Sequence, residues 1–294
     1  MKYNKSIYFS FGITILLWAS AFPAIKLALQ DFKAEDLSAL RLFIAAIILC
    51  IVGIIKKIAF PHIKDIPFIL LLGFCGFTVY HVALSIGEYY VSAGVASLIV
   101  STTPIFSALL ATFFLKEKFS KLAWLGSIIA FIGVALISLG NGDQRAAALL
   151  GVVLILLASL GESIYFSFQK QLLDKYGFMP LTIYTIVSGA LFMTLFLPNS
   201  FHELQHAHIN TMIAVLYLGI FPTVLPYIAL AYTIQKIGVS DATISLYLTP
   251  AVSLLLAYLM LGEIPTLIAI LGGIVTLVGV AITSAYSEDE LDLK

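Results

Sequence analysis

The sequence predicts an all-α polytopic membrane protein with ten transmembrane helices. Three observations support this fold class: apolar residues make up 61% of the 294 residues, charged residues make up only 11%, and the apolar residues gather in long runs. Soluble proteins have roughly 45–50% apolar and about 25% charged residues, so this chain has too few charges to cover a surface in water. The mean hydropathy of +1.06 also indicates an integral membrane protein.

Each predicted span is a run of about 20 mainly apolar residues, the length that an α-helix needs to cross the hydrocarbon core. The runs are longer than strands and lack the alternation of a transmembrane barrel, so every span is expected to be a helix. The ten spans cover residues 7–29, 35–55, 66–87, 92–115, 121–140, 148–173, 180–198, 209–234, 240–261 and 266–286.

The first run imitates a secretory signal peptide. Lys2 and Lys5 precede it, and Ala19-Ser20-Ala21 resembles a cleavage site. Nine further spans follow, with no sizeable hydrophilic domain to export, so we interpret the first run as a membrane helix.

Basic residues are distributed unevenly over the predicted loops. With a cytoplasmic N-terminus, twelve of the sixteen basic residues lie on the cytoplasmic side and only Lys33 and Arg145 lie outside. Cytoplasmic loops of membrane proteins carry such an excess of lysine and arginine. Both termini are therefore predicted to be cytoplasmic in a cell membrane of the bacterial inner-membrane type, and residues 287–294 form a short acidic tail.

The second half of the chain repeats the first at a constant offset, which is 146 residues between Pro104 and Pro250. Apolar composition can match alanines and leucines by chance, but it does not align a proline, a glutamate and two glycines at one offset. The identities include Thr103/Thr249, Pro104/Pro250, Ser107/Ser253, Glu117/Glu263, Gly126/Gly272 and Gly133/Gly279. Each repeat holds five helices, an odd number, so residues 1–144 and 145–286 are predicted to be inverted copies.

Inverted repeats of this kind are typical of secondary transporters, whose halves exchange conformations around a site near the midplane. We therefore predict a secondary-active or facilitative transporter that works by alternating access around a central cavity. Its expected partners are a small-molecule substrate, membrane lipid and protons as coupling ion, in a monomer or homodimer. Two alternatives remain open: a membrane-embedded lipid-modifying enzyme and a non-transporting membrane subunit.

Other classes of function find no support. The chain has no P-loop or dinucleotide-binding glycine fingerprint, so neither ATP drive nor a cofactor is expected. A net charge of zero does not favour nucleic-acid binding. The metal-like spacing of His202, His206 and His208 is interpreted as a solvated loop, and Cys50 and Cys75 lie in apolar runs without metal-type spacing.

Several segments resemble the EamA family of the drug/metabolite transporter superfamily. Residues 18–26, WASAFPAIK, resemble its W-G-S-x-F-x-x-x-K opening, and Leu40-Arg41-Leu42-Phe43 with Ala45-Ala46 is similar to its R-F-x-x-A pattern. The segment 92–98 with Pro104 and Lys116-Glu117-Lys118, and Tyr247-Leu248-Thr249-Pro250 with Leu261-Gly262-Glu263, look like its fourth-helix and ninth-helix signatures. The resemblance implies ten helices, cytoplasmic termini and a central cavity for small organic solutes, often exported amino acids or metabolites.

Ionisable residues within membrane helices are costly, so each is a functional candidate. Glu162 lies in the middle of the sixth span, where members of the family more often carry an apolar or aromatic residue. It is predicted to bind substrate or couple protons, the alternative being a glutamate that only joins helices. His81, beside Tyr80 in the third span, could relay protons or donate one hydrogen bond between helices.

Lys26, Arg41 and Glu88 fall toward the outer ends of the first three spans. They could form a buried charge network, an outer gate or, for Arg41, a clamp on a substrate carboxylate. The alternative is that Lys26 extends to the lipid headgroups.

Hydroxyl and aromatic side chains complete the predicted substrate site. Ser97, Ser101 and Pro104 recur at helical spacing, and Thr243, Tyr247 and Pro250 repeat the pattern, so one face of each helix carries hydroxyls beside a proline. The predicted substrate-binding residues are Trp18, Ser20, Phe22, Tyr80, His81, Ser97, Ser101, Glu162, Tyr165, Tyr227 and Tyr247, with helix breaks at Pro104, Pro222, Pro226 and Pro250.

Overall fold

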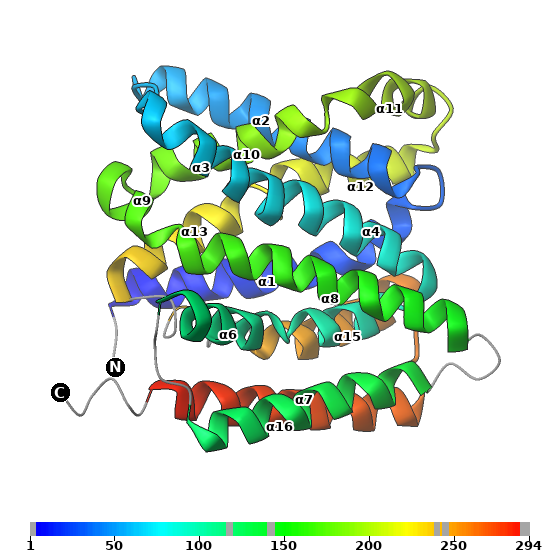
Figure 1. Ribbon diagram of the computed structural model, residues 1–294. Coiled ribbons are helices and arrows are strands. Elements are labelled where there is room, and N and C mark those ends of the chain that lie inside the picture. The colour runs from blue at the N-terminus through cyan, green and yellow to red at the C-terminus, as the bar shows by residue number, and fades with distance from the viewer. Residues whose placement is uncertain (1–3, 116–119, 140–144, 238–241, 243–246, 289–294) are drawn as a thin grey trace.

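The computed structural model describes residues 4–115, 120–139, 145–237, 242 and 247–288. Within these ranges every regular element is a helix, which confirms the all-α fold class. Figure 1 shows that most of the long helices lie roughly along one common axis and run up and down it, with α1 (Lys5–Ala28) inside the bundle and α2 (Ala34–Ile55) at one edge. Glu117, the junction near residue 144 and most of the acidic tail lie outside the described residues.

Two of the helical spans in the first half, the third and the fourth, are interrupted along their length. The third predicted span is one stretch, Ile63–Tyr90, built from η1 (Ile63–Asp65), α3 (Ile66–Gly73), the π-helical η2 (Phe74–Val79) and α4 (Tyr80–Tyr90). The fourth consists of α5 (Ala93–Val100) and α6 (Thr103–Leu115), and the fifth is α7 (Lys121–Leu139). Breaks of this type place backbone groups where they can face a cavity.

The described residues of the second half are also helical, with several interruptions. Its helices are α8 (Arg145–Phe168), α9 (Lys170–Tyr176), α10 (Phe178–Phe192), η4 (Thr194–Phe196), α11 (Leu197–Leu204), α12 (Ile209–Ile220), α13 (Leu225–Ile237), α15 (Thr249–Leu261) and α16 (Leu267–Glu288). The sequence predicts a loop after residue 198, but residues up to Leu204, including His202, continue as helix α11. Helix α10 and the stretch Thr194–Leu204 make a bent pair with an angle of 44°.

Among the residues that the structure describes, six helices are long and apolar enough to cross a membrane, or up to seven if the bent pair counts as one span. The apolar helices Lys121–Ile137, Thr249–Leu261 and Leu267–Thr283 are shorter within the described ranges. The chain is therefore an integral membrane protein, and the count of ten spans stays a prediction.

Helices α7 and α16 form an antiparallel pair that lies along one side of the bundle (Figure 1). A Cβ atom added to Gly126 would lie 2.7 Å from the Gly279 carbonyl oxygen, and one added to Gly133 would lie 2.6 Å from that of Gly272. Since Gly126 corresponds to Gly272 and Gly133 to Gly279 in the repeat, exchanging the halves converts one contact into the other. The glycines thus permit a close, pseudo-symmetric contact between inverted helices.

Candidate functional site

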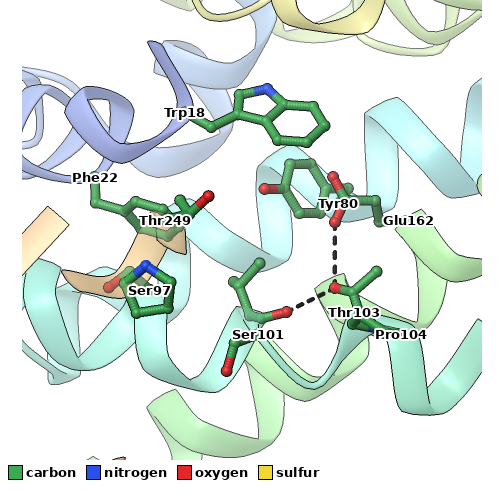
Figure 2. A pocket seen from close by; sticks show the side chains of 11 residues that line it. Trp18, Phe22, Tyr80, Ser97, Ser101, Thr103, Pro104, Glu162 and Thr249 are labelled. Atoms are coloured by element: carbon green, nitrogen blue, oxygen red, sulfur yellow. Dashed lines mark hydrogen bonds between the residues drawn. The ribbon is translucent and has the colours of Figure 1, made fainter. Parts of the chain in front are cut away.

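The central cavity lies where helices from both halves meet, and Figure 2 shows its side chains. Aromatic side chains from α1 and α4, hydroxyls from α5, α6 and α15, and one carboxyl group from α8 surround it. Its lining residues are Trp18, Phe22, Tyr80, Ser97, Val100, Ser101, Thr103, Pro104, Glu162, Thr249 and Pro250. Six of the predicted substrate-binding residues and two of the four predicted break prolines therefore lie around one space.

The break between α5 and α6 forms one wall of this cavity. Pro104 lies in the first turn of α6 and has no N–H to donate to the carbonyl of Val100. The hydroxyl of Thr103 lies 2.8 Å from that carbonyl oxygen and donates to it instead. Ser101 donates in the same way to Leu98 at 2.6 Å. Hydroxyl side chains thus satisfy the backbone of the interrupted helix.

Glu162 on α8 faces this break. Its side chain is 2% exposed, and its Oε2 lies 3.2 Å from the Thr103 hydroxyl, a contact drawn in Figure 2. Its Oε1 has no hydrogen-bond partner among the described residues. The next residue, Ser163, donates to the backbone carbonyl of Thr103 at 2.8 Å. Helix α8 therefore holds the break in place and leaves one carboxyl oxygen for a ligand.

The second repeat contributes the corresponding pair, Thr249 and Pro250, from the first turn of α15. The Thr249 hydroxyl is buried and finds no hydrogen-bond partner in the described part of the chain. The two equivalent threonines therefore differ: Thr103 is held by α8, while Thr249 is available to a ligand.

An adjoining cavity shares Trp18, Phe22 and Tyr80 with the central cavity and extends to Arg41 and His81. The Arg41 guanidinium is 3% exposed and donates from Nε and Nη2 to the Thr223 hydroxyl at 3.2 and 3.1 Å. Its Nη1 has no acceptor among the residues that the structure describes. A buried guanidinium with a free N–H is suited to bind a carboxylate.

The side chain of His81 is fully buried in the same region. Its Nδ1 donates to the Phe77 carbonyl at 2.8 Å, which leaves Nε2 without a partner in the described ranges. Tyr227 completes the adjoining cavity and packs against Trp18 and Phe77, with ring centroids 5.2 and 4.7 Å away. Tyr165 packs behind this cluster, 5.0 Å from Phe77.

Some of the predicted site residues are not among those that line the two cavities. Ser20 bonds the Tyr217 hydroxyl at 2.6 Å, and Tyr247 packs against an apolar cluster around Ile105. The Pro222 carbonyl accepts the Trp18 indole N–H at 3.2 Å in the turn between α12 and α13, and Pro226 lies in the first turn of α13.

The three charged residues of the predicted gate, Lys26, Arg41 and Glu88, differ in their hydrogen bonds. Lys26 donates to the backbone carbonyls of Glu88 and, at 2.9 Å, Val91, so it caps the end of α4. Within the described ranges both carboxyl oxygens of Glu88 are buried without a partner, and Arg41 lies in the adjoining cavity instead. Glu263 accepts from the Ala93 N–H at 2.9 Å and so ties the second half to the start of α5.

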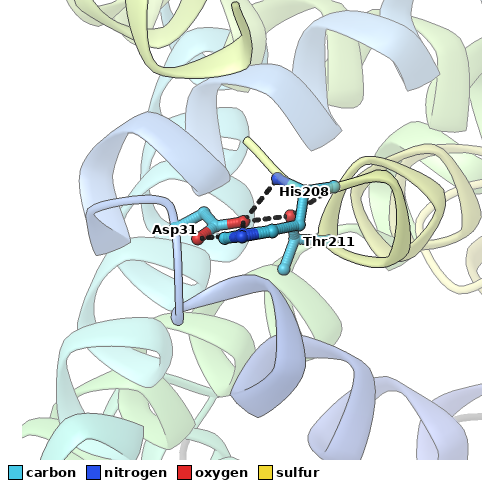
Figure 3. A network of polar contacts seen from close by, with 3 residues as sticks. All are labelled: Asp31, His208 and Thr211. Atoms are coloured by element: carbon cyan, nitrogen blue, oxygen red, sulfur yellow. Dashed lines mark hydrogen bonds and ion pairs between the residues drawn. The ribbon is translucent and has the colours of Figure 1, made fainter. Parts of the chain in front are cut away.

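A polar network of Asp31, His208 and Thr211 joins the two halves of the chain just beyond the end of α1 at Ala28 (Figure 3). The Asp31 carboxylate accepts hydrogen bonds from the Thr211 hydroxyl at 2.6 Å and from the His208 backbone N–H at 2.7 Å. The His208 ring Nδ1 is 2.9 Å away. These contacts, with that of Thr211 the largest, lower the pKa of Asp31 from 3.8 to about 2.

Sequence reasoning did not include Thr103, Thr249 or Val100 among the site residues. Thr103 and Thr249 directly precede the two repeated prolines and are identical in the repeat. A threonine before a helix-breaking proline was therefore the available signal.

The glycine contacts between α7 and α16 relate the two halves of the chain by pseudo-symmetry, and a buried polar cavity lies between these halves. Both features are typical of transporters. The sequence pattern of the EamA-like transporter family matches residues 5–139 and again residues 149–285. The chain belongs to the EamA-like transporter family, and its relatives are named as transporters or exporters and not as enzymes.

Relatives match over nearly the whole chain. The chain is 48% identical over 282 residues to the "uncharacterized transporter YdfC" of Bacillus subtilis, covering 96% of this chain and 92% of the relative. It is 34% identical over 280 residues, with 95% and 93% covered, to the "probable terminal-alkyne amino-acid exporter" of Streptantibioticus cattleyicolor. A solved structure titled "Crystal structure of protein" shares the fold, with a TM-score of 0.66, 16% identity, and 97% and 98% of the two chains covered.

Proposed function

We propose that this protein is a secondary-active or facilitative exporter of small organic solutes such as amino acids or related metabolites. Residues 1–144 and 145–286 are inverted halves that open the central cavity alternately to either side of a bacterial inner membrane. In this proposal the protein has ten spans, has both termini in the cytoplasm and works as a monomer or homodimer in contact with membrane lipid.

The observation that carries the proposal is the pair of buried ionisable groups in adjoining cavities. Glu162 and Arg41 each keep one polar atom without a partner among the described residues, and three aromatic residues line both cavities. A buried ionisable group with an unpaired polar atom is costly for folding, so its presence favours a role in binding. An amino acid offers an ammonium group and a carboxylate, which match these two groups.

The name of the relative from Streptantibioticus cattleyicolor supports amino acids as the substrate class. The interrupted helices support alternating access, because unwound segments beside the substrate are common at the midplane sites of transporters.

Protons are proposed as the coupling ion, with Glu162 as the group that exchanges them. Glu162 lies near the tyrosines Tyr80, Tyr165 and Tyr227. Tyrosine has a reference pKa of about 10, which is far from neutral, so the carboxyl group of Glu162 is the better candidate for proton exchange. His81 in the adjoining cavity is a second candidate for a proton relay, since its ring Nε2 has no partner among the described residues. If Glu162 couples protons, Glu162→Gln should flatten the dependence of flux on pH, and an unchanged profile would exclude it from coupling.

Counterflow in proteoliposomes tests the proposal. Vesicles loaded with one unlabelled solute from a panel of amino acids and related metabolites should take up the same labelled solute faster than empty vesicles. A lack of exchange for every panel member would favour the alternative of a non-transporting membrane subunit.

A further inference from the structure

Four of the N–H and O–H donors around the central cavity, those of Trp18, Ser97, Ser101 and Thr103, are committed to the protein itself. Ser97 donates to the Gly94 carbonyl at 2.7 Å, and Ser101 donates to Leu98. The single hydroxyl proton of Thr103 can go only to Val100 or to Glu162. The indole N–H of Trp18 donates to the Pro222 carbonyl.

Acceptors therefore predominate on the inner surface of the cavity. Ser97 and Ser101 retain oxygen lone pairs, since a hydroxyl carries one donor and two acceptor sites. Oε1 of Glu162 adds a carboxyl oxygen with no partner in the described part of the chain. The Thr249 hydroxyl can rotate to accept as well. A ligand that brings several donors and a positive charge would satisfy all of these groups.

Aromatic faces form the rest of the wall. Trp18, Phe22 and Tyr80 line the cavity together with Glu162, and all four side chains are at least nine-tenths buried. Aromatic rings attract organic cations through their negative faces, most strongly when water is excluded. A carboxylate beside aromatic rings is a combination suited to an ammonium group.

We infer that the central cavity is an ammonium subsite, in which Oε1 of Glu162 binds the positively charged nitrogen of the transported solute. The –NH₃⁺ group has three donors, which can be shared among Glu162, the serine lone pairs and Thr249. This inference rests on the proposed function and makes it narrower, because solutes without a cationic nitrogen lose the main polar contact of the cavity.

A sodium ion is the other cation that oxygen acceptors could hold. The aromatic wall favours an organic cation, since hard metal cations prefer a shell of oxygen ligands. The ammonium subsite therefore predicts the same affinity for an amine in sodium-free potassium buffer as in sodium buffer.

Three ligands that share the isobutyl side chain of leucine test the assignment by calorimetry on the purified full chain at a fixed pH near neutral. Isopentylamine carries only the ammonium group, leucine carries both charged groups, and 4-methylpentanoate carries only the carboxylate. Glu162→Gln is compared with wild type and with Glu35→Gln, a charge-removing control at the start of α2 away from both cavities.

Wild type and the control variant should bind isopentylamine and leucine, and Glu162→Gln should weaken both by about tenfold or more while leaving 4-methylpentanoate unaffected. Equal weakening of all three ligands, no weakening of any, or a requirement for sodium would overturn the ammonium subsite. Binding without counterflow would contradict the proposed function and not the subsite. Counterflow of a solute that has no cationic nitrogen, unaffected by Glu162→Gln, would contradict the subsite and not the function.

Discussion

The hydroxyl of Thr103 lies 3.2 Å from Oε2 of Glu162 and thereby connects the interrupted helix of the first half to α8 of the second half. The same hydroxyl lies 2.8 Å from the Val100 carbonyl oxygen, which Pro104 leaves without its usual helical donor. The side chain of Thr103 thus connects the Glu162 carboxyl group with the break between α5 and α6.

Thr103→Val should lower the thermal stability of the protein. Valine keeps the shape of the side chain but removes the one hydroxyl proton that the Val100 carbonyl and Glu162 share, at a cost of about 1–3 kcal/mol. Thr249→Val is the matched control, since the equivalent hydroxyl has no partner within the described ranges and its loss should matter little. Thermal unfolding in detergent measures both, and equal effects of the two variants would contradict the link.

Arg41→Lys should weaken the binding of carboxylates selectively. The arginine bonds Thr223 through two nitrogens and keeps Nη1 for a ligand, whereas a lysine has one nitrogen for both tasks. We expect about tenfold weaker binding of 4-methylpentanoate and an unchanged affinity for isopentylamine. Calorimetry with both ligands checks this, and a similar loss for both would indicate a defect in folding instead.

Gly133→Ala should destabilise the contact between α7 and α16. The added Cβ would lie within 2.6 Å of the Gly272 carbonyl oxygen, and such overlap costs about 1–3 kcal/mol. Gly12→Ala in α1 is the control, because its Cβ would meet nothing within 4 Å among the described residues and alanine favours the helix. A lower unfolding temperature for Gly133→Ala alone is expected, and unchanged stability would show that the helices can move apart.

Asp31→Asn should destabilise the protein in a pH-dependent way. The pKa of Asp31 in the folded protein is lowered to about 2 by Thr211 and His208, so the ionised carboxylate stabilises the fold. This contribution is fully present above the ordinary pKa of 3.8 and is lost as the pH falls through about 2.

The unfolding temperatures of wild type and Asp31→Asn, measured between neutral and strongly acidic pH, test the direction of this pH dependence. The difference between the two proteins should be constant from pH 7 to about pH 4 and should shrink below that value. A difference that grows on acidification would contradict the assignment.

The sequence was sufficient to predict the helical fold class and much of the cavity, because burial and helix breaking depend on local residue type. Apolar runs predicted the helices, and the repeated Pro104 and Pro250 pointed to the polar faces that line the cavity. Glu162 stood out because a carboxyl group within an apolar run is rare.

Partners across the bundle could not be predicted in this way. Arg41 bonds Thr223, 182 positions along the chain, and Asp31 bonds His208, 177 positions along. Lys26 donates to backbone carbonyls instead of pairing with a carboxylate. The packing of α1 against the end of α4 determines this contact, and the local sequence does not show it. Helix α11 was missed because its polar residues bond α2, as Ser200 does with Asp36 at 3.1 Å.

Accessibility of the central cavity from both membrane faces is the most direct test of alternating access. Ser101→Cys places a thiol in the cavity wall, after the native Cys50 and Cys75 have been replaced by alanine. A membrane-impermeant thiol reagent should modify this residue both in right-side-out and in inverted vesicles, and leucine should slow the reaction in each. Modification from one face only, under all conditions, would contradict the account.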